Sequence, residues 1–268
     1  MDTVNILFFG DVYARAGRNA IHQMMPLLRE RYQPDVIIAN GENIAGGFGI
    51  TENLAQKLHR YGVDVITLGN HTWNKRDDLG NALDKFEYLV RPANYPPGNQ
   101  GHGSTIFTTE DGVKIGVLNL IGRVYLPMTD CPFRVGEEHV MRLRRETPII
   151  VVDFHGEATS EKVAMGYFLD GKVSAVIGTH THIQTADEKI LPGGTAYITD
   201  CGMTGPHDSV IGVKKELALE HLIKSIQVRF EPAEKGVRIQ GVFIKVHTDT
   251  GKAISIERVD IENQGANH

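Results

Sequence analysis

Two histidines stand two residues apart in the segment 178–182 (Gly-Thr-His-Thr-His), directly after an apolar run at 173–177. That run is expected to be a buried strand, and its Gly-Thr end lets the chain turn off the sheet. Neutral imidazole is the commonest metal-ligand side chain, so His180 and His182 could bind metal. Both could equally be polar loop residues, because so short a pattern often has no such role. Partners elsewhere in the chain must decide between the two interpretations.

Polar side chains also follow four other predicted strands, at the point where each strand ends. They are Asp11 after the run 4–9, Glu42 and Asn43 after 36–39, Asn70 and His71 after 63–68, and His155 at the end of 149–155. The carboxyl ends of parallel strands lie at one edge of a sheet, so these groups can converge. All are oxygen or nitrogen donors, which favours Mn²⁺, Fe or Zn²⁺. The set is large enough for two ions about 3.5–4 Å apart that share a bridging carboxylate.

The elements that must position these groups alternate between strand and helix in the first 85 residues. Strand-like runs at 4–9, 36–39 and 63–68 are separated by helical periodicity at 17–31 and 51–61, where Thr51 is a plausible N-cap. Three β–turn–α units predict an α/β fold with a parallel or mixed sheet and helices packed on it.

The rest of the chain mixes loops, hairpins and further strands. Hairpins are predicted at 105–109 with 113–120 and at 189–191 with 195–199. Irregular loops are expected at 91–103 and 123–134, a short basic helix at 141–146, and a helix at 158–169 that Thr159 or Ser160 could cap. Antiparallel strands are expected at 225–231, 236–247 and 253–259. We expect one domain over residues 1–268, in which two β/α halves pack together.

Composition indicates which binding partners and which cellular compartment to expect. The formal net charge of −5 gives no basic surface for a polyanion, so no stable nucleic-acid partner is expected. The two cysteines, Cys131 and Cys201, make a disulfide framework or a thiolate zinc site unexpected. The first residues lack a basic leader, and no apolar run approaches the roughly 20 residues that span a bilayer. We therefore expect a cytoplasmic protein without a membrane partner.

Taken together, the strand-end motifs resemble the calcineurin-like metallophosphoesterase pattern. They read Gly10-Asp11, Gly41-Glu42-Asn43, Gly69-Asn70-His71, a strand-final His155 and Gly-Thr-His-Thr-His. The segments 152–162, 178–187 and 197–206 are closer still to bacterial YmdB-type phosphodiesterases. The resemblance implies a four-layer α-β-β-α sandwich of two mixed β-sheets flanked by helices, with a dinuclear site at the sheet ends.

Three departures from the general superfamily pattern are shared with the YmdB-type group. Tyr13 replaces the histidine of the usual Asp-x-His motif, Glu42 replaces the bridging aspartate, and Thr72 follows Gly-Asn-His in place of an acid. Asn43 could stand in for the missing imidazole. These departures point away from protein phosphatases and purple acid phosphatases.

The resemblance also implies a role for each matching residue. It assigns the first metal to Asp11, Glu42 and His182, with Asn43 as an additional candidate, and the second metal to Glu42, Asn70, His155 and His180. The cofactors would be two divalent or transition metal ions per chain, Fe or Mn, with Zn as an alternative. The ions would activate a water for attack on phosphorus. His71 would protonate the leaving alkoxide or stabilise charge on the phosphate, and a structural role at a helix entry is its alternative.

The implied activity is hydrolysis of small nucleotide phosphodiesters, with 2′,3′-cyclic nucleotides as the substrate class. Two alternatives stay open. One is a phosphomonoesterase or 5′-nucleotidase, and the other is a regulatory protein that senses a metal–nucleotide complex and hydrolyses it slowly. The substrate-contacting residues are not identified, and the sequence leaves a homo-oligomer open.

Overall fold

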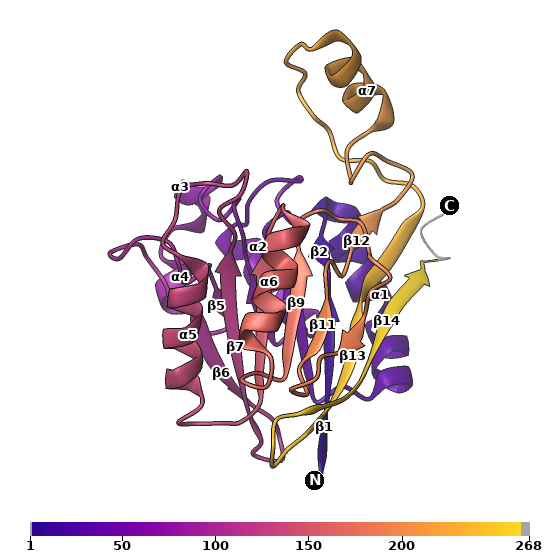
Figure 1. Cartoon of the computed structure of the whole chain (residues 1–268). Helices are drawn as coiled ribbons and strands as arrows, with labels where there is room; N and C mark the ends of the chain where they lie inside the picture. The colour runs from indigo at the N-terminus through magenta and orange to yellow at the C-terminus, as the bar shows by residue number, and fades with distance from the viewer. Residues whose placement is uncertain (1, 264–268) are drawn as a thin grey trace.

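Two β-sheets pack face to face in the computed structural model, which describes residues 2–263, and helices cover both outer faces (Figure 1). In the first sheet the order is β2 (Asp11–Val12), β12 (Met203–Pro206), β13 (Val237–His247), β1 (Thr3–Phe9), β3 (Val36–Asn40), β4 (Val65–Thr67) and β5 (Leu89–Val90), and β14 (Ala253–Glu262) pairs with β13. In the second sheet the order is β10 (Lys189–Ile190), β11 (Ala196–Ile198), β9 (Ala175–Thr179), β8 (Ile150–His155), β7 (Lys114–Ile121) and β6 (Ser104–Thr108).

The alternation of apolar residues along β1 shows how the layers form. Val4, Ile6 and Phe8 belong to the core between the two sheets, whereas Leu7 and Phe9 belong to the core beneath the helices. Successive side chains of a strand point to opposite faces, so the continuous apolar run 6–9 of β1 is covered on both sides. Each fully buried side chain of this size contributes roughly 1.5–3 kcal/mol through the hydrophobic effect.

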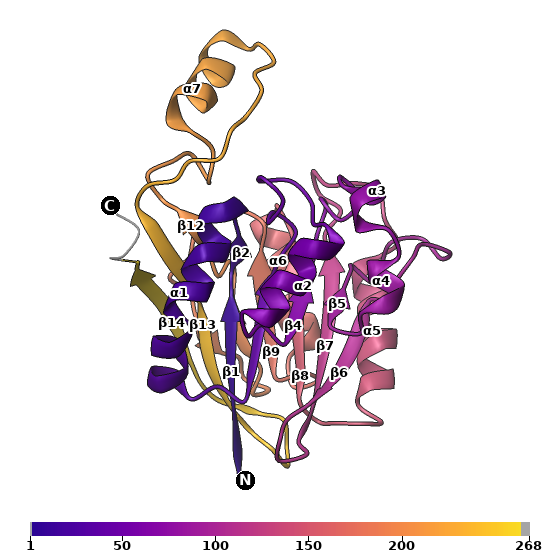
Figure 2. The ribbon, with the colours of Figure 1, turned by 180° about the vertical axis from the view of Figure 1, so that it is seen from behind.

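Helices complete the outer layers. The first sheet is covered by α1 (Ala14–Tyr32) and α2 (Glu52–Arg60), with the short helices α3 (Arg76–Leu79) and α4 (Ala82–Lys85) near its end, and the second by α5 (Pro132–Leu143) and α6 (Thr159–Leu169) (Figure 2). The predicted α/β class and the four-layer arrangement of two mixed sheets flanked by helices are therefore confirmed.

Several local predictions are confirmed as well. Thr51 is the N-cap of α2, and its hydroxyl accepts from the backbone N–H of Leu54 at 3.3 Å. The two predicted hairpins form antiparallel pairs, β6 with β7 and β10 with β11. The C-terminal strands β13 and β14 are also antiparallel, as expected.

In the middle of the chain, the bounds of one predicted helix are wrong, and the helix predicted at 158–169 is confirmed except for its cap. The basic helix expected at 141–146 is the end of α5, which begins at Pro132 and takes up the last part of the loop expected at 123–134. Proline is favoured in the first turn of a helix, and the buried residues Gly136, Val140 and Leu143 are spaced three or four apart. In α6 the N-cap is Ala158, without a side-chain cap, so neither Thr159 nor Ser160 has the expected role.

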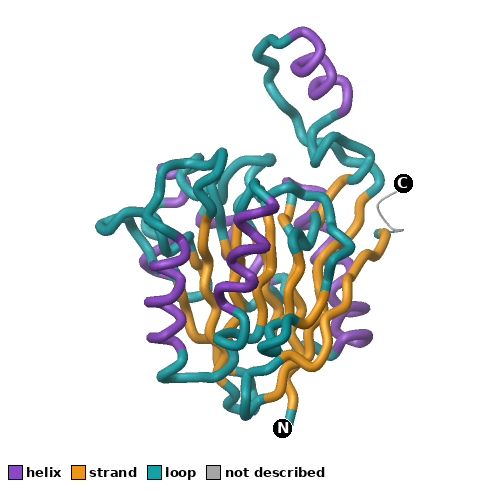
Figure 3. The backbone as a smooth tube through the Cα atoms, in the orientation of Figure 1, coloured by secondary structure: helices purple, strands orange, loops and turns teal. Residues whose placement is uncertain are grey.

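The strand expected at 225–231 is also wrong. Apolar residues at 226, 228 and 230 alternate with polar ones, as in a strand with one buried face, but this segment joins no sheet in the described structure. Instead, it returns alongside α7 (Lys215–Lys224), a helix that the sequence analysis missed. Together, residues 207–236 form an arm that extends beyond the body of the molecule (Figure 3).

Among the helices within residues 2–263, none is both long and apolar enough to cross a membrane.

Candidate metal centre

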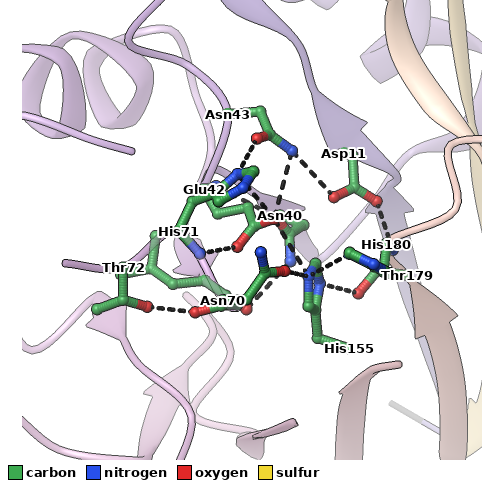
Figure 4. A network of polar contacts seen from close by, with 12 residues as sticks. Asp11, Asn40, Glu42, Asn43, Asn70, His71, Thr72, His155, Thr179 and His180 are labelled. Atoms are coloured by element: carbon green, nitrogen blue, oxygen red, sulfur yellow. Dashed lines mark hydrogen bonds and ion pairs between the residues drawn. The ribbon is translucent and has the colours of Figure 1, made fainter. Parts of the chain in front are cut away.

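The predicted site residues meet at the edge where the parallel strands of both sheets end (Figure 4). Asp11 lies in β2, the pairs Glu42–Asn43 and Asn70–His71 follow β3 and β4, His155 ends β8, and His180 and His182 follow β9. The first sheet supplies the donors of β2, β3 and β4, and the second sheet supplies those of β8 and β9, far away in sequence. The structure thus brings all eight predicted residues into one connected set of polar contacts.

One group of donors gathers around the inner nitrogen of His155. Its Nε2 atom lies 3.1 Å from Glu42 Oε1, 2.8 Å from Asn70 Oδ1 and 3.0 Å from His180 Nδ1. Donor atoms of Glu42, His155 and His180 all lie within 4.8 Å of one another. Four nitrogen and oxygen donors around one point are a chemically suitable set for Zn²⁺, Mn²⁺ or Fe. These are the four residues that the resemblance assigns to the second metal.

A second group gathers around Asp11. His182 Nε2 lies 3.6 Å from Asp11 Oδ1. The amide nitrogen of Asn43 lies 3.4 Å from Asp11 Oδ1 and 3.2 Å from His182 Nε2, and 3.5 Å from Glu42 Oε1, which connects the two groups. In this orientation Asn43 presents its NH₂ group to the carboxylates, while its carbonyl oxygen faces His71.

The charges of the buried groups also suit a cation. Asp11 is fully buried, which by itself raises its pKa, but the neighbouring His182 and other contacts outweigh burial and leave the pKa below its usual range. Glu42 behaves alike: burial raises its pKa, and His155 brings it below the ordinary value. Burial lowers the pKa of His155, but the charge of Glu42 and further contacts raise it to about 9. Two buried carboxylates that stay ionised need positive charge beside them, which protonated His155 and His182 supply in the metal-free protein and a bound metal ion could supply in place of their protons.

The pKa of His180 is shifted in the opposite direction from that of His155. Burial and the charge of His155 lower the pKa of His180 to about 3. A neutral imidazole keeps one nitrogen lone pair, which a metal ligand requires.

A buried carboxylate that the sequence analysis did not single out supports the donors from behind. Asp153 accepts hydrogen bonds from Thr67, Thr179 and Asn40. Thr179 Oγ1 in turn lies 2.9 Å from His155 Nδ1, so this hydroxyl can accept from the ring while it donates to Asp153. Asp153 precedes His155 by two residues on β8 and lies in the segment 152–162 that resembles the YmdB-type group, but neither signal gave it a role.

The turn that carries His180 and His182 is held by a second missed carboxylate. Both histidines have positive φ, 104° and 65°, which non-glycine residues adopt rarely. Asp200 accepts from the backbone N–H of Thr181 at 3.0 Å and from its hydroxyl at 2.8 Å, and Lys162 Nζ lies 2.7 Å from the same oxygen. Asp200 and Lys162 both lie in segments similar to the YmdB-type group, but that similarity gave them no role.

His71 lies beside the donors rather than among them. Its backbone N–H donates to Glu42 Oε2 at 2.8 Å, its Nδ1 atom lies 2.8 Å from Asn43 Oδ1, and its side chain is 25% exposed. Burial lowers the pKa of this ring, opposed by the charge of Glu42. With Nδ1 engaged, Nε2 is the atom available to a substrate.

Tyr13, which replaces the usual histidine of the first motif, is 3% exposed. Its ring packs edge-on against His182, with the ring centroids 5.6 Å apart. Tyr13 therefore supports a candidate ligand by packing.

Comparisons with known proteins agree on the family. The family described as YmdB-like protein matches residues 7–259. A 2′,3′-cyclic-nucleotide 2′-phosphodiesterase of Bacillus subtilis is 45% identical over 97% of this chain and 98% of that protein.

Solved structures show the same fold. The crystal structure of a novel phosphatase from Mycoplasma pneumoniae is 39% identical, with a TM-score of 0.90 over 98% of this chain and 94% of that chain. A 5′-nucleotidase precursor from Thermus thermophilus is 14% identical, with a TM-score of 0.58 over 98% of this chain and 55% of that chain. At that identity, the likeness concerns the fold alone.

Proposed function

Because the chain belongs to the YmdB-like protein family, we propose that it is a metal-dependent phosphodiesterase that hydrolyses small nucleotide phosphodiesters, with 2′,3′-cyclic nucleotides as the substrate class. The convergence of Glu42, Asn70, His155 and His180 on one point is the observation that carries the proposal. The activity of the Bacillus subtilis relative supports the choice of substrate class.

The metallophosphoesterase fold implies divalent metal ions, and the proposal places two in this chain, Fe or Mn, with Zn as the alternative. Glu42, Asn70, His155 and His180 would hold one ion. Asp11, Glu42, His182 and Asn43 would hold the other, so that Glu42 serves both. Asn43 can offer its oxygen only if its amide turns over relative to the orientation in the structure.

Bound ions would supply Lewis-acid chemistry, by polarising the phosphate and activating a water. The protein's own part is to hold the donors before substrate arrives. Asp11 and Glu42 stay ionised through their histidine contacts. Burial of the donors excludes bulk water and strengthens each electrostatic contact with the phosphate.

His71 is the proposed catalytic proton donor. Its Nδ1 atom is engaged by Asn43 and its side chain is 25% exposed, which leaves Nε2 for contact with a substrate. Burial favours the neutral ring in the free protein, and the negative charge of a bound phosphodiester would favour the protonated ring that can donate to the leaving alkoxide.

We also propose that residues 1–268 form one metallophosphoesterase domain, although residue 1 and residues 264–268 lie outside the described structure. A cytoplasmic location is part of the proposal, and the free thiols Cys131 and Cys201 support it, since reduced cysteines are typical of that compartment.

The test compares hydrolysis of 2′,3′-cyclic AMP, bis-p-nitrophenyl phosphate and p-nitrophenyl phosphate by the wild type and by Glu42→Gln. We expect the wild type to prefer the two diesters and Glu42→Gln to lose at least ~100-fold in kcat/KM, because the shared carboxylate loses its charge. Glu146→Gln, an exposed glutamate paired with Lys114, is the control and should match the wild type.

Undiminished hydrolysis by a folded Glu42→Gln protein would refute the proposed site. A wild type that prefers p-nitrophenyl phosphate would identify a phosphomonoesterase instead.

A further inference from the structure

The three histidines of the candidate metal centre each turn one ring nitrogen toward the other donors and one nitrogen away from them. The outward nitrogen of His155 lies 2.9 Å from Thr179 Oγ1, and that of His182 lies 2.8 Å from the carbonyl oxygen of Ile211. The outward nitrogen of His180, Nε2, instead faces a carboxylate: Glu157 Oε2 is 3.0 Å away. In each case an outer acceptor fixes which nitrogen carries the proton.

The chain path explains how Glu157 reaches His180. In the parallel pair β8–β9, His155 lies opposite Thr179. The N–H of Gly156 donates to the Thr179 carbonyl at 3.3 Å, which keeps the two chain ends together beyond the sheet. Glu157 is the next residue on one chain and His180 the next on the other.

His180 depends on such a contact more than His155 does. His155 lies within a strand and is fully buried, so packing restrains its ring. His180 lies beyond β9, has a φ of 104°, and its side chain is 19% exposed. Its ring orientation must therefore come from what its two nitrogens contact, His155 on one side and Glu157 on the other.

We propose that Glu157 is a positioning residue for the metal ion bound by His180. Glu157 accepts a hydrogen bond from the Nε2–H group of His180. This contact leaves Nδ1, beside His155, as the nitrogen with the free electron pair, and it makes the ring a stronger metal ligand. The inference rests on the proposed function, because it assumes that His180 binds one of two ions. Glu157 itself is not a ligand in this assignment: its side chain is 46% exposed and lies on the outer side of the ring.

Titration of the metal-free protein with Mn²⁺, followed by calorimetry, tests this role without relying on activity. We expect two sites in the wild type. Glu157→Ala should weaken one site by about 10–100-fold and leave the other unchanged, as is typical when the outer partner of a metal-bound histidine is removed. Glu157→Gln keeps an oxygen that accepts from His180 and should recover most of the lost affinity.

Two controls separate this role from a general structural one. Glu146→Ala removes a carboxylate that is 51% exposed and should bind Mn²⁺ like the wild type. The melting temperature of metal-free Glu157→Ala should equal that of the metal-free wild type.

The outcomes are distinguishable. If the wild type binds two Mn²⁺ ions and Glu157→Ala binds both as tightly, or loses affinity equally at both, the role of Glu157 is overturned alone. If the wild type binds no Mn²⁺, Fe²⁺ or Zn²⁺, the proposed function fails and the inference fails with it.

Discussion

Glu42 is the residue on which the two halves of the site depend. Its Oε1 atom lies 3.1 Å from His155 Nε2, and its Oε2 atom accepts from the backbone N–H of His71 at 2.8 Å. The backbone N–H of Glu42 donates to Asn40 Oδ1 at 3.1 Å, which fixes the chain just after β3. Oε1 thus lies between the two groups of donors, since the amide nitrogen of Asn43 is 3.5 Å from the same atom, while Oε2 is held by the His71 backbone.

Replacing His71 with alanine tests the proposed proton donor. We expect His71→Ala to lower kcat for 2′,3′-cyclic AMP by roughly 10²–10⁴-fold, the usual contribution of a general acid. Metal content should stay at the wild-type value, because His71 is not a proposed ligand. Elemental analysis and steady-state kinetics of the same preparation check both points.

His247→Ala is the matched control, since His247 pairs with Thr3 at the start of β1, away from the strand ends that form the site. An unchanged kcat in His71→Ala would show that His71 is not the proton donor and would favour its alternative, a structural role at a helix entry.

At the residue scale, the sequence predicted the inner donors but none of their outer partners. Asp11, Glu42 and His155 could be identified because a polar residue at the end of an apolar run is visible locally. Glu157 and Asp200 could not, because their roles depend on which strand ends lie side by side, and one-dimensional periodicity does not give that register.

The elements differ in how far local sequence determines them. The cap of α2 was predicted because Thr51 and its partner Leu54 are three residues apart. The start of α5 was not, because the apolar face of this helix is set by contact with β7, and Gly136 lies against Leu120 there. The helix of the arm at 207–236 was missed because its apolar residues do not form one buried face. Leu222 and Ile223 are exposed, so the spacing of apolar residues did not indicate a packed helix.

Helix α5 also gives a pH-dependent contribution to stability. His139 Nδ1 lies 3.0 Å from Ser104 Oγ on β6 and 2.9 Å from the guanidinium of Arg142. Burial and the charge of Arg142 lower the pKa of His139 to about 4. The unfolded chain, with an ordinary histidine pKa of about 6.5, therefore binds a proton more readily than the folded chain between these values.

The contribution of His139 to the free energy of unfolding is present above pH 6.5 and decreases as the pH falls toward 4. We expect the wild type to lose about 1 kcal/mol more than His139→Gln between pH 7.5 and 5.5, measured by urea unfolding. Equal losses in the two proteins would show that His139 is not held neutral by this contact.

At the scale of the whole molecule, the site exists only where the two sheets meet. The first sheet supplies Asp11 and the residues after β3 and β4, and the second sheet supplies His155 and the histidines after β9. The apolar core between the sheets sets the distance between these groups. The resemblance to a known family predicted this four-layer arrangement, whereas the pattern of strands and helices alone predicted one domain of two packed β/α halves and left the order of the layers open.

Elemental analysis of the purified protein, before and after chelation, shows whether bound metal ions are needed for hydrolysis. We expect about two Fe or Mn ions per chain, loss of 2′,3′-cyclic AMP hydrolysis when they are removed, and its return when Mn²⁺ is added back. A metal-free protein that hydrolyses 2′,3′-cyclic AMP at the full rate would show that this protein is not a metal-dependent phosphodiesterase.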